Sequence, residues 1–172
     1  MESALRQPDG SFELVDQFTG EVLCTWPSLE SWAQAWFDEW RTRAFGHASE
    51  FMNSLTSEPP ADIVGVLVSV AELAADDAGL LAFVGAGPLE SLLSDSAEGS
   101  VFVDAAQSAA RRSPSFRRAL SAVWLGEEVP ESVRHELAVF GARDFVAEQA
   151  MKPDELRAYF ADRDARGFLG RD

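Results

Sequence analysis

Cysteine and lysine are almost missing from this 172-residue chain, which contains one cysteine, Cys24, and one lysine, Lys152. A single cysteine excludes a disulfide framework within the chain and any zinc site built from several cysteines. No run of about 18 apolar residues occurs, so we expect no membrane-spanning segment. The first ten residues lack the basic and then apolar order of a signal peptide, and we therefore expect a cytoplasmic protein.

Basic residues are absent from residues 59–110, which contain eight acidic side chains. Residues 1–58 contain ten acidic and three basic side chains, residues 111–172 are balanced, and the whole chain has a net charge of -15. This field repels the phosphates of nucleic acids and anionic lipid headgroups, so we expect neither a nucleic acid nor a membrane as a partner. It attracts basic proteins. An acidic surface that serves solubility alone is the alternative interpretation, and it stays open.

Two β-prone runs within residues 12–25 flank a turn that contains Gly20, and this order predicts a β-hairpin. We expect its buried side to consist of four apolar residues, which are Phe12, Leu14, Val22 and Trp26. An isolated hairpin is only marginally stable in water, so this hairpin must pack on other elements of the chain.

A tryptophan-rich helix is predicted directly after the hairpin. Ser28 is a typical N-cap for it, and Glu30 in the first turn interacts favourably with the helix dipole. Trp32, Trp36 and Trp40 recur every four residues and therefore form one ridge. Such a ridge could be a ligand platform, but large aromatic side chains gain most from burial, so we assign it to the core.

Caps, prolines and glycines divide the rest of the chain into further helices. We expect Gly46 to end or kink the tryptophan-rich helix. The next helix is expected to start at residues 57–60, and the apolar run at 63–75 predicts a helix that is buried on both sides. We also expect a helical turn over 51–55, a cap from Asp76 and Asp77, N-caps at Ser100 and Ser113, and a left-handed stop at 85–87. Further helices are expected to run through residues 125 and 140, and a last helix is expected from Lys152.

Together these elements predict a mainly all-α fold with an N-terminal β-hairpin. The stretches 77–93 and 113–137 share an order of cap, apolar helix, glycine and proline, which favours a short helix-pair stack, although a compact helical bundle would give the same pattern. We expect three parts: the hairpin with the tryptophan-rich helix in residues 1–58, packed on a helical core domain in 59–142, and a helical extension with a frayed tail in 143–172.

Two segments, LAFVGAGPLE at residues 81–90 and FRRALSAVWL at residues 116–125, resemble an uncharacterised family of bacterial helical domains of unknown function. The resemblance covers residues 60–141, about half of the chain. It implies a small all-α domain, and it implies no activity, cofactor or catalytic residue.

The chain contains few of the residues that catalysis or metal binding requires. His47 can share a helix face with Glu50, and His135 with Glu131, but the two histidines lack metal-site spacing and no known catalytic motif occurs. Cys24 has no basic neighbour that would activate its thiol, so we interpret it as a small buried residue. We therefore expect no enzyme, no catalytic residue, no metal site and no cofactor.

One basic cluster follows the acidic segment, and it consists of Arg111, Arg112, Arg117 and Arg118. Since the rest of the chain is strongly acidic, we expect these guanidinium groups to form ion pairs with carboxylates of the same chain.

An acidic helical chain without catalytic residues suits a protein that binds a basic protein partner, and the most specific form of this hypothesis is an immunity or inhibitor protein that occludes a toxin. The predicted partner-binding residues are all carboxylates of residues 59–110: Asp62, Glu72, Asp76, Asp77, Glu90, Asp95, Glu98 and Asp104. A helical adaptor or scaffold that binds through an apolar groove is the first alternative, and an enzyme of unknown reaction is the second. The sequence leaves the oligomeric state open.

Overall fold

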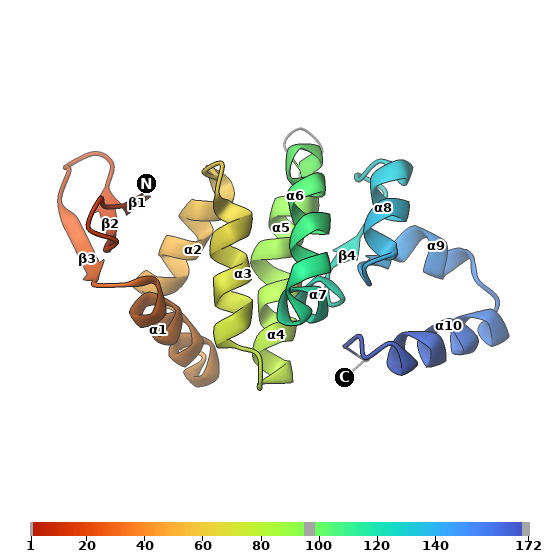
Figure 1. Cartoon of the computed structure of the whole chain (residues 1–172). Helices are drawn as coiled ribbons and strands as arrows, with labels where there is room; N and C mark the ends of the chain where they lie inside the picture. The colour runs from red at the N-terminus through yellow and green to blue at the C-terminus, as the bar shows by residue number, and fades with distance from the viewer. Residues whose placement is uncertain (1, 95–98, 170–172) are drawn as a thin grey trace. The chain divides into compact units, whose positions relative to one another are not determined.

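A computed structural model describes residues 2–94 and 99–169, and it is mainly helical with a small antiparallel sheet near the N-terminus (Figure 1). The predicted mainly helical class with an N-terminal hairpin is therefore confirmed. The chain divides into two units, Met1–Val66 and Leu67–Asp172, and the division falls within α3 (Ile63–Leu73). None of the described helices is long and apolar enough to cross a membrane.

The first unit begins with a sheet of three strands, β1 (Glu2–Arg6), β2 (Phe12–Asp16) and β3 (Val22–Trp26), which pair antiparallel in that order. The predicted hairpin corresponds to β2 and β3. Sequence reasoning missed β1, because its residues, ESALR, have little preference for strands. The N–H of Ala4 donates a hydrogen bond to the hydroxyl of Ser54 at 2.9 Å, and this contact fixes β1 on α2 (His47–Ser57).

The buried side of the hairpin matches the prediction at three of four positions, since Phe12, Leu14 and Trp26 are buried. The prediction for Val22 is wrong, because its side chain is 48% exposed. An irregularity between Leu14 and Val15 pairs Val15 directly with Val22, whereas Leu14 pairs with Cys24. Cross-strand partners share a face, so this one-residue shift turns Val22 to the opposite face from Leu14.

Helix α1 (Leu29–Thr42) begins as predicted at Ser28, whose hydroxyl accepts a hydrogen bond from the N–H of Ser31. Trp32 and Trp36 are fully buried, which confirms the core assignment for two positions of the ridge, and Trp40 is half-buried. The predicted end at Gly46 is wrong.

The helix ends at Thr42 because Arg43 adopts a left-handed conformation, with φ of 57°, and its N–H bonds to the carbonyl of Glu39. Gly46 instead precedes α2 as its N-cap residue. Helix α2 runs for 11 residues, much longer than the short turn that we predicted there.

The core of the first unit is a cluster of aromatic rings from the sheet, α1 and α2. Phe51 of α2 lies at its centre, with ring centroids 5.1 Å from Trp32, 5.4 Å from Trp26 and 5.7 Å from Phe12. Trp32 also stacks on Trp36 at 6.1 Å, and its indole N–H donates to a backbone carbonyl of α2. Each ring hides a large apolar area, so this cluster ties the sheet to both helices.

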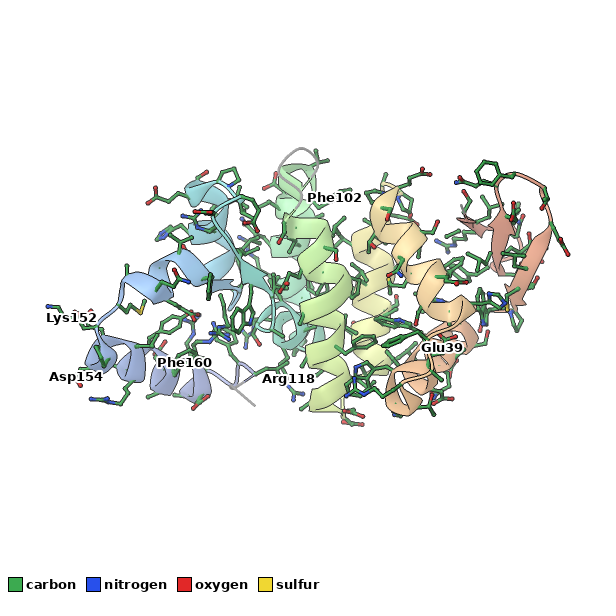
Figure 2. The ribbon with its side chains drawn as sticks, turned by 180° about the vertical axis from the view of Figure 1, so that it is seen from behind. Glu39, Phe102, Arg118, Lys152, Asp154 and Phe160 are labelled. Atoms are coloured by element: carbon green, nitrogen blue, oxygen red, sulfur yellow. The ribbon has the colours of Figure 1, made fainter. Side chains whose placement is uncertain are left out.

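The N-terminus of α2 is capped from another helix. Gly46 has no side chain to cap it, and the carboxylate of Glu39 on α1 accepts hydrogen bonds instead, from the N–H groups of Gly46 at 3.0 Å, Ala48 at 3.0 Å and Ser49 at 2.9 Å (Figure 2). The Ser49 hydroxyl donates a fourth bond at 2.7 Å. Burial raises the pKa of Glu39, but the Ser49 hydroxyl and the three N–H groups together outweigh it, and the pKa is lowered.

We expect Glu39→Gln to lower the free energy of unfolding at pH 7 by about 1 kcal/mol, because the variant loses the charge at the helix N-terminus. Since the pKa of Glu39 is lower in the folded state, its contribution is complete above the ordinary glutamate pKa and disappears as the pH falls through the lowered value. Urea unfolding of both proteins at pH 7 and at pH 3 measures this. Glu21→Gln, on the exposed hairpin, is the control, and an equal effect of both substitutions would contradict the capping role.

Prolines 59 and 60 separate α2 from α3 and do not open a helix, so the predicted start at residues 57–60 is wrong. Helix α3 is apolar as predicted, but it is not buried on all sides, since Gly65, Glu72 and Leu73 are exposed.

The second unit then continues with α4 (Ala78–Val84), a π-helical turn η1 (Gly85–Leu89), α5 (Glu90–Ser94), α6 (Gly99–Arg112) and α7 (Pro114–Leu120). The predicted caps Asp77 and Ser113 are confirmed by hydrogen bonds from the N–H groups of Leu80 and Phe116. Helix α6 begins at Gly99, so Ser100 lies within the helix and not before it.

The predicted left-handed stop at residues 85–87 is also wrong. Gly85 has ordinary helical dihedral angles, and the N–H of Glu90 bonds to the carbonyl of Gly85, five residues earlier, which defines a π-helical turn. The wider turn accommodates Pro88 within a continuous helical path. Gly85 is required for a different reason, because a Cβ there would overlap the carbonyl oxygen of Ala119 on α7.

The chain after α7 does not continue the predicted helix to residue 125. Trp124 and Leu125 form β4 (Trp124–Leu125), which pairs in parallel with β5 (Arg143–Asp144). The stretch 113–137 therefore differs in structure from 77–93. Helix α8 (Glu131–Ala138) connects the two strands and ends two residues before the predicted end at residue 140, and Gly141, with φ of 109°, lies beyond it.

Two helices complete the described chain. Helix α9 (Phe145–Ala150) was not predicted, whereas α10 (Pro153–Ala165) begins as predicted and extends further than we expected. Phe168 beyond it is buried. Its ring lies on Gly141, where any Cβ would be 2.8 Å from the ring, so the end of the described chain packs on the residues after α8.

Candidate functional site

The predicted acidic residues lie in different parts of the chain. Asp62 belongs to the first unit and the others to the second. Glu72 on α3, Asp76 directly before α4 and Asp104 on α6 are exposed, and no ion pair involves them in the described part of the chain. Asp95 and Glu98 lie outside the described residues, so the predictions for them stay untested.

Three of the predicted residues have structural partners. Asp77 caps α4, as described above, and Asp62 forms an exposed ion pair with Arg6 at 3.0 Å. Glu90 accepts a hydrogen bond from the N–H of Trp124 at 2.8 Å, which fixes the start of β4. Burial raises the pKa of Glu90, the Trp124 N–H lowers it, and nearby Glu128 raises it further, so the net shift is upward. Glu90 is therefore a positioning residue of the fold rather than a freely exposed charge.

Within residues 2–94 and 99–169 the arginine cluster does not pair with carboxylates as we expected. Arg111 bonds to the side-chain amide of Gln107, and Arg112 to a serine hydroxyl. Arg118 donates to the backbone carbonyl of Ala75 at 3.0 Å, and Arg117 lies over an aromatic ring. Because these partners are neutral, the cluster does not neutralise the carboxylates of the preceding acidic segment by direct ion pairs among the described residues.

Buried arginines that sequence reasoning missed organise the end of the second unit. Arg143 on β5 binds both carboxylate oxygens of Glu148 on α9, and both side chains are almost completely buried. Arg163 on α10 is 3% exposed and donates to the backbone carbonyls of Gly141 and Ser121. Arg134 on α8 is also buried and forms an ion pair with Asp144. These contacts stabilise the packing of α8, α9 and α10 on β4 and β5.

An exposed aromatic patch lies above Arg143. The ring of Trp124 is stacked on that of Phe145 with centroids 5.6 Å apart, and the residues are 41% and 38% exposed. The guanidinium carbon of Arg143 lies 3.8 Å from the centroid of the Trp124 ring and 5.2 Å from the centroid of the Phe160 ring on α10. Val146, the next residue after Phe145, is also partly exposed. Aromatic residues that remain half-exposed over a charged group are typical of protein-binding surfaces.

A cavity of about 130 Å³ lies within the first unit, between β1, α2 and the residues that lead into α3. Phe12, Leu55 and Val66 form its apolar walls, and all three are buried. Ala4 lines it from β1. Its volume is close to that of cavities that hold a benzene molecule in other proteins, so it can take a small apolar group.

Charged residues surround the opening of this cavity. Arg6, Glu58 and Asp62 line it and are exposed, so they lie where it meets solvent. The Arg6–Asp62 ion pair belongs to this rim, and the guanidinium carbon of Arg6 lies 5.9 Å from the centroid of the Phe12 ring. With two carboxylates and one guanidinium, the rim has an excess of negative charge.

The remaining candidates for chemistry are isolated. His47 bonds to Glu50 at 3.1 Å, as predicted, and both are exposed, while His135 is an exposed residue of α8. Cys24 is a half-buried free thiol on β3. In the described residues no three potential ligands come close enough together to hold a metal ion.

These observations define a mainly helical protein with an acidic exposed surface, an aromatic patch and, in its first unit, a small cavity with an acidic rim. The model of a family of unknown function, DUF6869, matches residues 37–143. The match covers more than half of the chain, so the chain belongs to this family, and the predicted resemblance to an uncharacterised domain family is confirmed. No curated protein and no solved structure matches the chain.

Proposed function

We propose that the protein is a non-enzymatic binding protein whose acidic surface docks on a basic protein partner. The observation that carries this proposal is the acidity of residues 59–110, where Glu72, Asp76 and Asp104 are exposed and form no ion pair in the described part of the chain. The eight carboxylates of residues 59–110 have no basic neighbour within the segment, and the four arginines that follow it bind neutral groups. Such a field accelerates the association with a basic protein and favours it over acidic ones.

The most specific form of this proposal is an immunity or inhibitor protein that occludes a basic toxin in the cytoplasm. Occlusion requires a complementary shape and charge but no reacting groups, which agrees with the isolated positions of His47, His135 and Cys24. Glu72, Asp76 and Asp104 are the exposed carboxylates that we assign to partner binding.

Affinity capture with the immobilised protein tests the proposal. We expect a basic protein from a lysate of the source organism to be retained and then released between about 0.1 and 0.5 M salt, because salt screens exposed charges. The triple variant Glu72→Gln, Asp76→Asn, Asp104→Asn should bind the purified partner at least tenfold more weakly.

A matched control removes the same charge elsewhere, through Glu21→Gln, Glu127→Gln and Asp164→Asn, and it should bind almost normally. If both triple variants lost the same partner affinity, binding would depend on net charge alone and not on Glu72, Asp76 and Asp104. Retention of no basic protein would contradict the proposal.

A second function, a helical adaptor, is favoured by the aromatic patch of Trp124, Phe145 and Val146. A helix-pair stack, one of the two arrangements predicted for the helices, would supply an apolar groove for it. Burial of apolar area is insensitive to screening, so a partner bound in this way should remain bound in high salt and be lost in the Trp124→Ala variant.

A further inference from the structure

The cavity in the first unit combines apolar walls with an acidic rim, and this combination restricts what can fill it. A purely apolar molecule would leave the rim charges unused, and an anion would meet Glu58 and Asp62. A short unbranched carbon chain with a cationic end satisfies both parts. In proteins this is the chemistry of lysine and arginine, whose stems pack on apolar surfaces while their charged ends stay at the surface.

The chain itself indicates which cation fits. The guanidinium of Arg6 pairs with Asp62 at 3.0 Å and lies 5.9 Å from the Phe12 ring, so the rim already accommodates a guanidinium between a carboxylate and an aromatic ring. Planar guanidinium groups favour this combination more than ammonium groups do.

Another cation can easily displace Arg6 from Asp62, because the two side chains are 60% and 62% exposed. Exposed pairs contribute little stability, so a competing cation can replace Arg6 at small cost. Glu58, also on the rim, provides a second carboxylate for the incoming charge.

We infer that this cavity is a socket for an arginine side chain of the basic partner, with its stem against Phe12 and Val66 and its guanidinium at Glu58 and Asp62. Arg6 occupies the rim in the absence of the partner and competes with it. The inference rests on the proposed function, to which it adds an anchor residue and a regulatory competitor, and it can be tested without knowing the partner.

The probe is n-butylguanidinium, titrated into ¹⁵N-labelled full-length protein, with n-butanol as the neutral probe. We expect saturable shifts of the amide signals of Ala4 and Leu55 with the cation and much weaker binding of the alcohol. Asp62→Asn and Glu58→Gln should each weaken the binding of the cation about three- to fivefold. These residues are exposed, and the amide spectrum itself reports whether each variant remains folded.

The strongest test is a variant that should bind better. Arg6→Ala frees Asp62 and should tighten n-butylguanidinium binding about three- to fivefold. Arg43→Ala removes the same charge from another place in the first unit and should leave the affinity unchanged. An equal gain in both variants, equal binding of alcohol and cation, or unchanged amide signals would each overturn the socket.

The socket and the proposed function can fail separately. If the partner is captured and depends on Glu72, Asp76 and Asp104, but Asp62→Asn has no effect on either partner or probe, the socket is wrong and the acidic surface remains. If the probe binds as expected while no basic protein is retained, the socket's chemistry is supported and the proposed function is contradicted.

Discussion

Gly85→Ala is expected to destabilise the protein by about 3 kcal/mol or more, because overpacking of a rigid contact is among the costliest single changes. The added Cβ would overlap the carbonyl oxygen of Ala119 and lie 2.8 Å from the Cβ of Ala122. Neither atom belongs to a flexible side chain, so η1 and α7 must move apart to make room. Urea unfolding followed by tryptophan fluorescence measures the loss.

Gly87→Ala is the matched control, two residues later in the same π-helical turn. Apart from its two neighbours in the chain, a Cβ at this position meets no atom within 4 Å. Alanine favours helical backbone over glycine, but the ring of Pro88 crowds a Cβ on the helical residue before it, so we expect this variant to lose far less stability than Gly85→Ala and not to gain any. Similar unfolding midpoints for the two variants would show that Gly85 is not needed for the contact with α7.

Glu148→Met should cost about 3–5 kcal/mol, because it leaves the guanidinium of Arg143 buried without its counter-ion. The two side chains are only 7% and 5% exposed, and two hydrogen bonds join them. The loss should appear as a lower midpoint in thermal and urea unfolding. The near-ultraviolet signal of Trp124, whose ring covers Arg143, should change as well.

Two further variants test whether the loss of stability in Glu148→Met comes from the unpaired buried charge or from the substitution as such. Asp154→Asn breaks the exposed pair with Arg157 on α10 and should change the stability by less than about 1 kcal/mol. The double variant Arg143→Met, Glu148→Met removes both buried charges and should be more stable than Glu148→Met alone. If the double variant were the less stable protein, the cost would arise from lost packing and not from an unpaired charge.

The sequence predicts those parts of the fold that depend on neighbouring residues. Ser28, Asp77 and Ser113 cap helices through bonds to residues three positions later, and all three were predicted. The role of Gly85 was not predicted, because a glycine shortly before a proline resembles a helix stop. The residue must be glycine because the backbone of Ala119, 34 positions later, leaves no room for a Cβ. No local pattern contains that contact.

For the candidate site, as for the fold, the sequence predicts local properties but not contacts between residues far apart in the chain. The acidity of residues 59–110 and the exposure of Glu72 follow from the sequence, but the structural tasks of Asp62 and Glu90 depend on Arg6 and Trp124, 56 and 34 residues away. The cavity could not be predicted, because one of its sides is β1, which has no strand pattern.

The bonds that Arg163 donates also bear on where a minimal fragment of this protein can be cut. The family match ends at residue 143, yet the carbonyls of Ser121 and Gly141 within it are bound by Arg163 at 2.7 and 2.6 Å. A fragment trimmed to the matched region would expose these carbonyls, together with the surface that Phe168 covers. The smallest autonomous fragment of the second unit should therefore extend through Phe168, and protease cleavage between α9 and α10 should loosen residues that lie more than ten positions earlier.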